Sequence, residues 1–329
     1  MSANVATRLL QHYVDNFRRL PWRAPPGSPP TDPYFVWLSE VMLQQTTVAA
    51  VVPRFQRFVD RWPTIAALAA ASDADVMQEW AGLGYYARAR NLIACARRVA
   101  ELGGFPRDEA GLRRLPGIGD YTAAAIAAIA FGQDSAPVDT NVERVVARIH
   151  GLTGKDSIRA AATAMVPRGR AGDFAQAMMD LGAAICRPKA PLCRSCPLAA
   201  SCRAFALGTP ETFPQPKIRK ARPQRHGLAH WIERDGCIWL VRRPTKGVLG
   251  GMAALPGPDW EDEPLAGPAI ARVRRVFTHF TLELAVVPTR EPWGDGWWQP
   301  LDRLADAGLP TLYRRAAEAV LGSRTALAA

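Results

Sequence analysis

The sequence has no apolar run long enough to span a bilayer, and its first residues lack the charged-then-apolar pattern of a secretory signal. Cysteine is scarce, with six residues among 329. Because disulfides belong mainly to secreted proteins, the missing secretory segment argues against a disulfide framework. We therefore expect an intracellular, cytoplasmic protein that does not associate with membranes.

Four of the six cysteines nevertheless lie within one 17-residue segment, at Cys186, Cys193, Cys196 and Cys202. Four thiolates at this spacing can hold a metal centre, either a zinc ion or an iron–sulfur cluster. A disulfide pair or ordinary buried thiols are the alternatives. The other two cysteines, Cys95 and Cys237, stand apart and are expected to be single buried or half-buried thiols.

The charge balance is strongly basic, with 41 Lys and Arg against 30 Asp and Glu and a net charge of +11. Such an excess favours contacts with the phosphates of a polyanion. A merely basic soluble protein from an arginine-rich proteome is the alternative. At this length the chain can form two domains, each with its own core.

Helical periodicity dominates the first two hundred residues, and few windows alternate with the period of a strand. Helices are predicted over Ile65–Ala71, Val76–Glu79, Ala87–Leu102, Thr122–Ala130, Val142–His150 and Phe174–Ile185. After Cys202 three prolines and then five basic residues interrupt the chain between positions 210 and 225. This composition predicts a linker, which is either a solvated tether or a strap that follows phosphates.

From His226 onward the pattern is typical of strands. Leu228–Glu233 and Cys237–Val241 flank Asp235-Gly236, which predicts a hairpin. A strand pair or one long strand is expected within Arg274–Val287, and a closing helix over Thr311–Leu321. The C-terminal part is therefore predicted to be a small α+β domain.

A Leu-Pro-Gly-Ile-Gly segment at residues 115–119 precedes a helix that is expected to begin near Tyr121. The bare amides of Gly117 and Gly119, together with the positive end of the helix, suit a phosphate. The segment matches a helix–hairpin–helix element, which grips one DNA backbone without reading its sequence. A plain helix–helix turn is the alternative.

Two carboxylates have contrasting sequence contexts. Asp139 directly precedes a helical run and is predicted to cap it, a position that favours the ionised form. Glu40 lies among apolar residues on a helix that Asp32 is expected to cap and Pro33 to start. Burial would raise the pKa of Glu40, so that it carries a proton near neutral pH. A surface position on a polar stripe is the alternative for Glu40.

Residues 37–46 (WLSEVMLQQT) and 82–92 (GLGYYARARNL) resemble the signatures of the MutY family of adenine DNA glycosylases. The glycine hairpin, the Val138-Asp139 segment and the cysteine spacing are similar to the wider endonuclease III superfamily. The resemblance runs from about Leu20 to Cys202 and continues more loosely from Arg242 to His279.

The resemblance implies a multidomain architecture. A mainly α-helical helix–hairpin–helix glycosylase domain is expected over residues 1–209 and includes the cluster region 186–202. A basic, proline-rich linker is expected over 210–226, and a C-terminal α+β Nudix-like domain that recognises 8-oxoguanine over 227–329.

The resemblance also implies an enzyme of base excision repair that hydrolyses the N-glycosidic bond of adenine mispaired with 8-oxoguanine or guanine. Glu40 matches the general acid that protonates adenine N7, and Asp139 matches the carboxylate that stabilises the sugar cation. Tyr121 and Asn141 match positions that support this catalytic site. The expected substrate is double-stranded DNA. The protein is expected to be a monomer and to associate with the nucleoid.

Further residues match positions that contact DNA in the family. Arg23 and Gln176 correspond to side chains near the extruded adenine, and Gln45 and Tyr85 to side chains that wedge into the duplex. Gln44 is also expected to bind the DNA or the base. For Tyr85, core packing is the alternative.

The cysteine spacing matches the ligands of a 4Fe–4S cluster, and the resemblance therefore favours this cluster over zinc. Arg187 and Lys189 would then reach phosphates from the cluster loop.

Phe277-Thr278-His279 corresponds to the family's Phe-Ser-His loop, which contacts 8-oxoguanine. A buried core histidine is the alternative for His279.

A working Nudix hydrolase needs a helix that carries a cluster of metal-binding glutamates. The segment after Gly257 has only Glu261, Asp262 and Glu263, so Nudix pyrophosphatase activity is not expected. Thr140 stands where the family often has glycine, so either that turn needs no positive φ or its geometry differs.

Bifunctional members of the superfamily carry a lysine at the start of the helix that follows the glycine hairpin, and here that position is Tyr121. We therefore expect a monofunctional glycosylase that leaves an abasic site. Two alternatives stay open at this point. One is a bifunctional glycosylase and lyase of the endonuclease III type that acts on oxidised pyrimidines, and the other is a non-catalytic protein that marks lesions by bending DNA.

Overall fold

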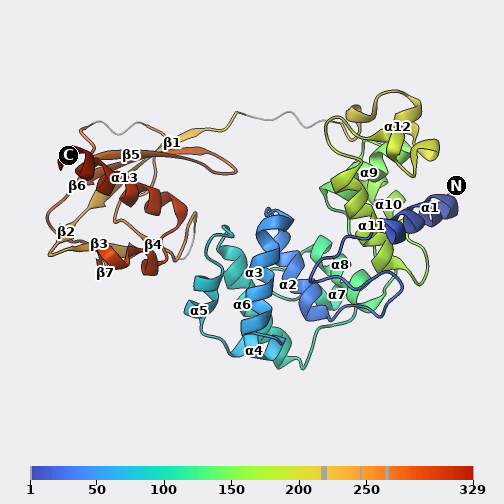
Figure 1. Ribbon diagram of the computed structural model, residues 1–329, viewed down its shortest axis with the longest axis horizontal. Coiled ribbons are helices and arrows are strands. Elements are labelled where there is room, and N and C mark those ends of the chain that lie inside the picture. The colour runs from blue at the N-terminus through green and yellow to red at the C-terminus, as the bar shows by residue number, and fades with distance from the viewer. Residues whose placement is uncertain (1, 216–220, 245–246, 264–266, 329) are drawn as a thin grey trace. The chain divides into compact units, whose positions relative to one another are not determined.

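The computed structural model describes residues 2–215, 221–244, 247–263 and 267–328. Its contacts divide the chain into two compact units, residues 1–79 with 88–218 and residues 80–87 with 219–329 (Figure 1). Within the described residues, no helix combines the length and the apolar character that a membrane span requires.

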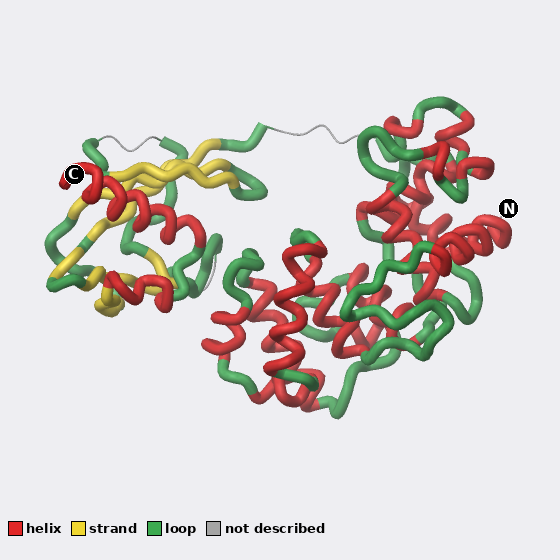
Figure 2. The backbone as a smooth tube through the Cα atoms, viewed as in Figure 1, coloured by secondary structure: helices red, strands yellow, loops and turns green. Residues whose placement is uncertain are grey.

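The described part of the first unit consists of helices, short 3-10 turns and loops (Figure 2). The helices are α1 (Ser2–Asp15), α2 (Pro33–Leu43), α3 (Val48–Arg61), α4 (Ile65–Ala70), α5 (Asp73–Glu79), α6 (Ala87–Glu101), α7 (Glu109–Leu112), α8 (Asp120–Phe131), α9 (Thr140–His150), α10 (Lys155–Met165), α11 (Ala171–Ala184) and α12 (Arg203–Ala206). The predicted helical segments are confirmed, with shifts of a few residues at their ends.

Helix α8 is central to the first unit, because α2, α7 and α11 all pack against it. Its residues from Thr122 to Ala128 are buried, and most of them are alanines. Small side chains let neighbouring helices approach closely. An added Cβ at Gly172 of α11 would lie 2.8 Å from the carbonyl oxygen of Ala128, so α11 rests directly on the backbone of α8.

A separate part of the core joins the N-terminal helix to the second half of the unit. Helices α1, α9, α10 and α11 contribute the buried side chains Leu9, Val146, Ile158 and Met178 to one apolar cluster. Burying such side chains contributes about 1.5–3 kcal/mol each. This cluster fixes α9 and α11 against each other at the point where their polar residues face the site described below.

The predicted helix starts are confirmed. The Asp32 carboxylate accepts the amide hydrogen of Tyr34, and Pro33 opens α2. Asp139 caps α9 by accepting the amide hydrogens of Asn141 and Val142. Both carboxylates satisfy helix amides that have no partner inside the helix.

The glycine turn joins the short helix α7 to α8, which begins at Asp120, one residue before Tyr121. Gly117 has a φ of +74°, and an added Cβ would meet the side chain of Asn91 at 2.7 Å. Glycine is therefore required there both for conformation and for space. Gly119 is the N-cap of α8 with ordinary extended dihedrals.

The second unit contains two small sheets and the helix α13 (Thr311–Ala328). One sheet has the order β1-β6-β5, with β1 (Gln224–Trp231) parallel to β6 (Thr281–Pro288), and β6 antiparallel to β5 (Ala271–Val276). The other sheet contains β2 (Glu233–Arg234), β3 (Cys237–Arg242), β4 (Ala253–Ala254) and β7 (Gly296–Pro300). The core of this unit includes Trp231, Leu240, Leu284 and Tyr313. The predicted combination of a helical part with a C-terminal α+β part is confirmed.

The predicted hairpin is wrong in part. Asp235 and Gly236 form the turn with φ values of +49° and +71°, but only the two residues of β2 continue into a strand that pairs with β3. The segment before them belongs to β1, whose partner is β6 in the other sheet. Local turn signals do not reveal this pairing, because the partner strand β6 lies far along the chain from β1. Strand β1 also begins at Gln224, inside the predicted linker.

Candidate active site

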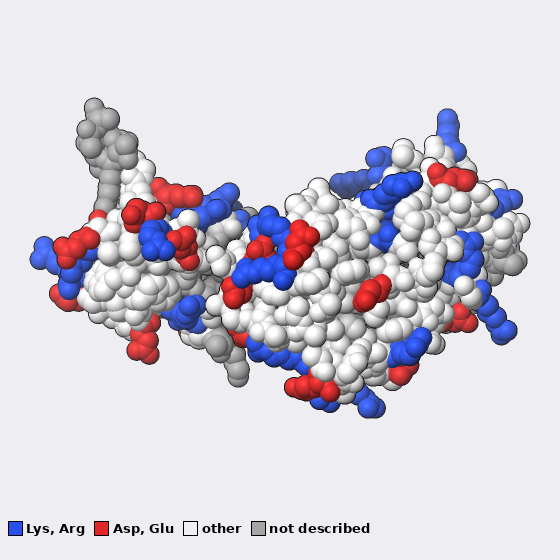
Figure 3. Space-filling model, turned by 60° about the horizontal axis from the view of Figure 1, so that its bottom comes forward, with Lys and Arg blue, Asp and Glu red and all other residues white. Residues whose placement is uncertain are grey.

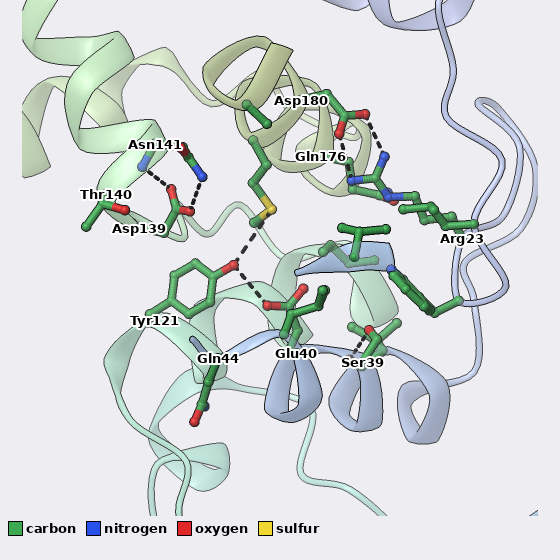
Figure 4. Close-up of a pocket in the computed structure, with 18 of the residues that line it drawn as sticks. Arg23, Ser39, Glu40, Gln44, Tyr121, Asp139, Thr140, Asn141, Gln176 and Asp180 are labelled. Carbon is green, nitrogen blue, oxygen red and sulfur yellow. Dashed lines mark hydrogen bonds and ion pairs between the residues drawn. The ribbon is translucent and has the colours of Figure 1, made fainter. Parts of the chain in front are cut away.

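A cavity of about 590 Å³ opens in the first unit among helices α2, α8, α9 and α11 and the segment after α1 (Figure 4). Eight of the sequence-predicted site residues line this cavity, although they are up to 153 positions apart in the chain, from residue 23 to residue 176. They are Arg23, Glu40, Gln44, Gln45, Tyr121, Asp139, Asn141 and Gln176.

Glu40 is buried, with 8% of its surface exposed, and it comes from a helix whose residues from Val36 to Met42 are all buried. The polar-stripe alternative for Glu40 is therefore wrong. Burial raises the pKa of Glu40 to about 7, because removing a carboxylate from water disfavours its ionised form. The nearby charge of Asp139 acts in the same direction, whereas Tyr121 and Arg23 lower the pKa.

The hydroxyl group of Tyr121 donates a hydrogen bond to Glu40 Oε2 at 2.9 Å (Figure 4). Burial, reinforced by the neighbouring carboxylates, raises the pKa of Tyr121 well above its usual value of 10. The phenol therefore stays protonated at neutral pH and serves as a donor. The same hydroxyl lies 3.7 Å from the sulfur of Met179, so the ring is held between α2 and α11.

Asp139 has a different environment from Glu40. Its Oδ1 accepts the amide hydrogens of Asn141 at 2.9 Å and Val142 at 2.7 Å, and its Oδ2 accepts from Asn141 Nδ2 at 3.0 Å. Three donors and the positive end of α9 all favour a negative charge at this position. Figure 4 shows Asp139 and Glu40 on different sides of the Tyr121 ring, both in the same cavity.

Asp139 has a φ of −87°, so the chain enters α9 in an ordinary extended conformation, and Thr140 is the first residue of the helix. The turn therefore needs no glycine at position 140. A β-branched residue is accepted there because no left-handed conformation is required.

Arg144 holds the side chain of Asn141 in place through a hydrogen bond. Its Nη2 donates to Asn141 Oδ1 at 2.9 Å and to the carbonyl oxygen of Gly182 at 2.7 Å, and its Nε donates to the carbonyl oxygen of Cys186 at 2.7 Å. One buried guanidinium thus joins the start of α9 to the end of α11 and to the first cysteine of the group. An added Cβ at Gly182 would lie 2.6 Å from Cβ of Asn141, so the two helices cross closely here.

The cavity also contains an ion pair that the sequence reasoning missed. Arg23 Nη1 lies 2.6 Å from Asp180 Oδ2, and Arg18 contacts the other oxygen at 3.1 Å. Asp180 follows Gln176 by one helical turn, so both side chains lie on the same face of α11. This spacing was the available signal for Asp180, since Gln176 was already a candidate.

Two residues predicted to enter the duplex occupy rare backbone conformations. Gln45 has a φ of +59° and Tyr85 a φ of +46°, and both are exposed. Positive φ costs non-glycine residues free energy and persists where the surrounding structure enforces it. Tyr85 is 49% exposed, so the core-packing alternative for this residue is wrong.

The remaining predicted DNA contacts do not line this cavity. Gly117 and Gly119 are exposed on the turn before α8. In the second unit, Phe277 stacks on Phe280 with ring centroids 4.9 Å apart, whereas Thr278 and His279 are exposed. The core-histidine alternative for His279 is therefore wrong.

All four clustered cysteines, Cys186, Cys193, Cys196 and Cys202, line one small cavity in the first unit. Arg148 lines it too, and its Nη1 lies 3.4 Å from the sulfur of Cys186. None of the six cysteines forms a disulfide, so the disulfide alternative is wrong. Cys95 is buried and Cys237 half-buried, and neither lines this cavity.

Known proteins share both parts of the chain. Residues 38–168 match the HhH-GPD superfamily of base excision DNA repair proteins, and residues 228–319 match the NUDIX domain. A solved structure of a thermostable thymine-DNA glycosylase superposes with a TM-score of 0.57 at 28% identity, and the match covers 63% of this chain and 97% of that one.

Human adenine DNA glycosylase is 37% identical over 311 residues, which cover 77% of this chain and 57% of the human protein. The chain thus spans little more than half the length of this relative. Adenine DNA glycosylase of Buchnera aphidicola subsp. Acyrthosiphon pisum is 33% identical over 258 residues, which cover 75% of this chain and 72% of that protein. From these matches and the two domain assignments, we conclude that the chain belongs to the adenine DNA glycosylase family.

Proposed function

We propose that this chain is a monofunctional glycosylase of base excision repair that hydrolyses the N-glycosidic bond of adenine mispaired with 8-oxoguanine or with guanine in double-stranded DNA. The observation that carries the proposal is the pair of unlike carboxylates in one cavity. Glu40 is buried and retains a proton near pH 7, while Asp139 accepts three hydrogen bonds at a helix N-terminus. Glycoside hydrolysis uses this division between an acid and an ionised partner.

The reaction begins when the adenosine leaves the base stack, because its glycosidic bond is inaccessible inside the duplex. Glu40 then transfers its proton to adenine N7, and the electron pair of the bond between C1′ and N9 leaves with the base. The carboxylate of Asp139 stabilises the positive charge that develops on the sugar. Water adds to C1′ and loses a proton, which restores the acid form of Glu40.

Other cavity residues support this chemistry. Tyr121 orients Glu40 through its hydrogen bond, and Asn141 holds the second oxygen of Asp139. Arg23 and Gln176 would bind the extruded adenine, and Gln44 also lines the cavity. We assign Asp180 a positioning role, because its ion pair fixes the direction of the Arg23 guanidinium.

Further contacts, most of them outside the cavity, would hold the DNA. Gln45 and Tyr85 would wedge into the duplex, and Gly117 and Gly119 would offer amides to a phosphate. Phe277, Thr278 and His279 would contact 8-oxoguanine; the hydroxyl group of Thr278 takes the place of the family's serine. On the face visible in Figure 3, basic side chains stand in several separate groups, some of them beside acidic ones. The net charge of +11 favours contacts with phosphates.

We assign the glycosylase domain to residues 1–209, the linker to 210–226 and the 8-oxoguanine recognition domain to 227–329. The two matched regions, 38–168 and 228–319, support this division, and the contact units change at residue 218, inside the linker. Strand β1 takes up the last three residues of the linker. We also propose that the protein acts as a monomer associated with the nucleoid.

For the cysteine group we propose a 4Fe–4S cluster held by Cys186, Cys193, Cys196 and Cys202. The four cysteines line one small cavity, so their thiolates face a common space. Their spacing in the sequence matches the ligands of a 4Fe–4S cluster, which supports the cluster over zinc. The cluster would have a structural role, in which it shapes the loop that carries Arg187 and Lys189.

The bifunctional alternative requires an amine that forms a Schiff base with the sugar. The described residues that line the cavity include no lysine, and Tyr121 occupies the start of α8. This observation supports the monofunctional mechanism.

Substrate choice is the first prediction. The full chain should release free adenine from a duplex with 8-oxoguanine opposite adenine and, more slowly, from one with guanine opposite adenine. It should release nothing from guanine:cytosine or thymine:adenine duplexes or from one with an oxidised pyrimidine, and the product strand should stay intact until base is added. Strand cleavage at neutral pH, or release of the oxidised pyrimidine, would favour the endonuclease III type of mechanism.

The second prediction concerns the acid. Glu40→Gln keeps the size of the side chain and an oxygen that accepts from Tyr121, but it has no proton to transfer. Single-turnover adenine release should fall by about 10²–10⁴-fold, the usual contribution of a general acid, while duplex affinity stays unchanged. Glu101→Gln, at the exposed end of α6, is the control and should keep wild-type release. Normal release by Glu40→Gln would exclude Glu40 as the acid.

The third prediction is that the free energy of unfolding depends on pH through the proton on Glu40. The folded-state pKa of Glu40, about 7, lies above its ordinary value of 4.5, so the stabilising effect of proton binding is complete below pH 4.5 and is lost as the pH rises through 7. The Glu40→Gln side chain does not ionise, so this variant does not lose stability through position 40 as the pH rises. Its advantage over wild type in the free energy of unfolding should therefore increase between pH 5 and pH 8 by up to about 3 kcal/mol. Urea unfolding followed by helical circular dichroism measures the difference, and an advantage independent of pH would contradict the burial argument.

Metal analysis tests the cysteine group. The purified chain should be yellow-brown and contain about four iron and four sulfide per molecule, the composition of a 4Fe–4S cluster. Cys193→Ser should lower the iron content, whereas Cys237→Ser, at a cysteine outside the cavity, should not. A colourless protein with one zinc ion per chain would rule the cluster out.

A further inference from the structure

A second cavity, of about 320 Å³, adjoins the active-site cavity and is not used by the mechanism described above. The two cavities share Ile129 and Gln176 as lining residues. The remaining walls of the second cavity come mainly from the loop 24–31 and the segment 169–173 at the start of α11. Its volume falls within the range of small-molecule sites, about 300–1,000 Å³.

The loop 24–31 forms a fixed wall for this cavity. The amide of Ala24 donates to Thr31 Oγ1 at 2.9 Å, which closes the loop on itself, and the amide of Ser28 donates to the carbonyl oxygen of Pro25 at 3.0 Å. Four of its eight residues are prolines, each with a fixed φ. A loop with so little conformational freedom keeps the cavity open before any ligand binds, and a preformed site costs less entropy to fill.

Both hydrogen-bond donors and a hydrogen-bond acceptor line the second cavity. Helix α11 starts without a side-chain cap, so its first amides are available as donors. Gln176 is only 7% exposed, and its Nε2 donates to the carbonyl oxygen of Gly172 at 3.3 Å. Within the described part of the chain, the Gln176 side-chain oxygen accepts no hydrogen bond, and it is available to a ligand donor.

The charged side chains that line the second cavity limit which ligands it can bind. Asp173 and Arg170 both line it and form an ion pair with each other, so their charges cancel and the cavity offers no excess positive charge to an anion such as a phosphate. A neutral ring with nitrogen acceptors for the helix amides and an exocyclic amine for Asp173 or Gln176 fits the available groups. Free adenine has both features.

We propose that the second cavity receives the adenine base after its glycosidic bond has broken, and that the base moves past Gln176, which lines both cavities. This inference rests on the proposed function. The nucleotide that enters the active-site cavity leaves its sugar and backbone at the entrance, and the cleaved base therefore cannot leave by that path while the DNA stays bound. A side chamber lets the base separate from the sugar before the DNA dissociates.

The test is the binding of radiolabelled adenine to the full-length protein without DNA, measured by equilibrium dialysis. Ser28→Trp should obstruct the second cavity, and Asp173→Asn removes its carboxylate acceptor; each should weaken adenine binding about tenfold, equivalent to about 1.4 kcal/mol. Asp156→Asn is the matched control, because Asp156 is the exposed first-turn aspartate of α10, and it should bind adenine as wild type does. Hypoxanthine, which has a carbonyl oxygen in place of the exocyclic amine, should bind more weakly than adenine.

Adenine affinity that is unchanged in both Ser28→Trp and Asp173→Asn would overturn the inference, as would the absence of adenine binding to the wild type. Adenine release by the wild-type protein, measured on the mispaired duplex, separates this failure from failure of the proposed function. A protein that excises adenine but binds the free base equally well in all variants would refute only the second site. A protein that binds adenine in the predicted manner but excises none would refute only the glycosylase proposal.

Discussion

The contrast between two carboxylates is the physical constraint on which the site depends. Glu40 is removed from water, which opposes its ionisation, whereas Asp139 receives two amide hydrogens and one side-chain amide that favour its charge. The environments differ although both residues face one cavity. Burial makes Glu40 the carboxyl group that binds its proton more tightly, while the hydrogen bonds to Asp139 hold that carboxylate in a fixed position.

The helical framework maintains that contrast. Helix α2 is buried along most of its length and presents Glu40 from an apolar surface, while α9 presents Asp139 at its uncovered N-terminus. The alanines of α8 and the glycines of α11 let these helices approach closely, so that Tyr121 reaches Glu40. Arg144 then ties Asn141 to the loop that begins the cysteine group, so the geometry of the acid-base site and that of the cysteine loop are connected.

Much of this arrangement could be predicted from the sequence because its signals are local. The caps at Asp32 and Asp139, the glycine turn and the two-part organisation follow from short-range chemistry. The burial of Glu40 could not be predicted from its own segment, since it arises from helices distant in the chain. The same limit explains the strand pairing of β1 and the ion pair between Arg23 and Asp180, both of which join residues far apart in sequence. Family resemblance identified Arg23 without showing that its partner is Asp180.

The central claim is that the carboxyl group of Glu40 in the folded protein loses its proton only near pH 7, well above the ordinary range of a glutamic acid. Difference infrared spectroscopy of the protein labelled with ¹³C-glutamate, with Glu40→Gln as the subtracted reference, measures that proton directly. The account predicts a protonated carboxyl band that disappears with a midpoint near pH 7. A midpoint close to 4.5, the ordinary value for glutamic acid, would contradict it.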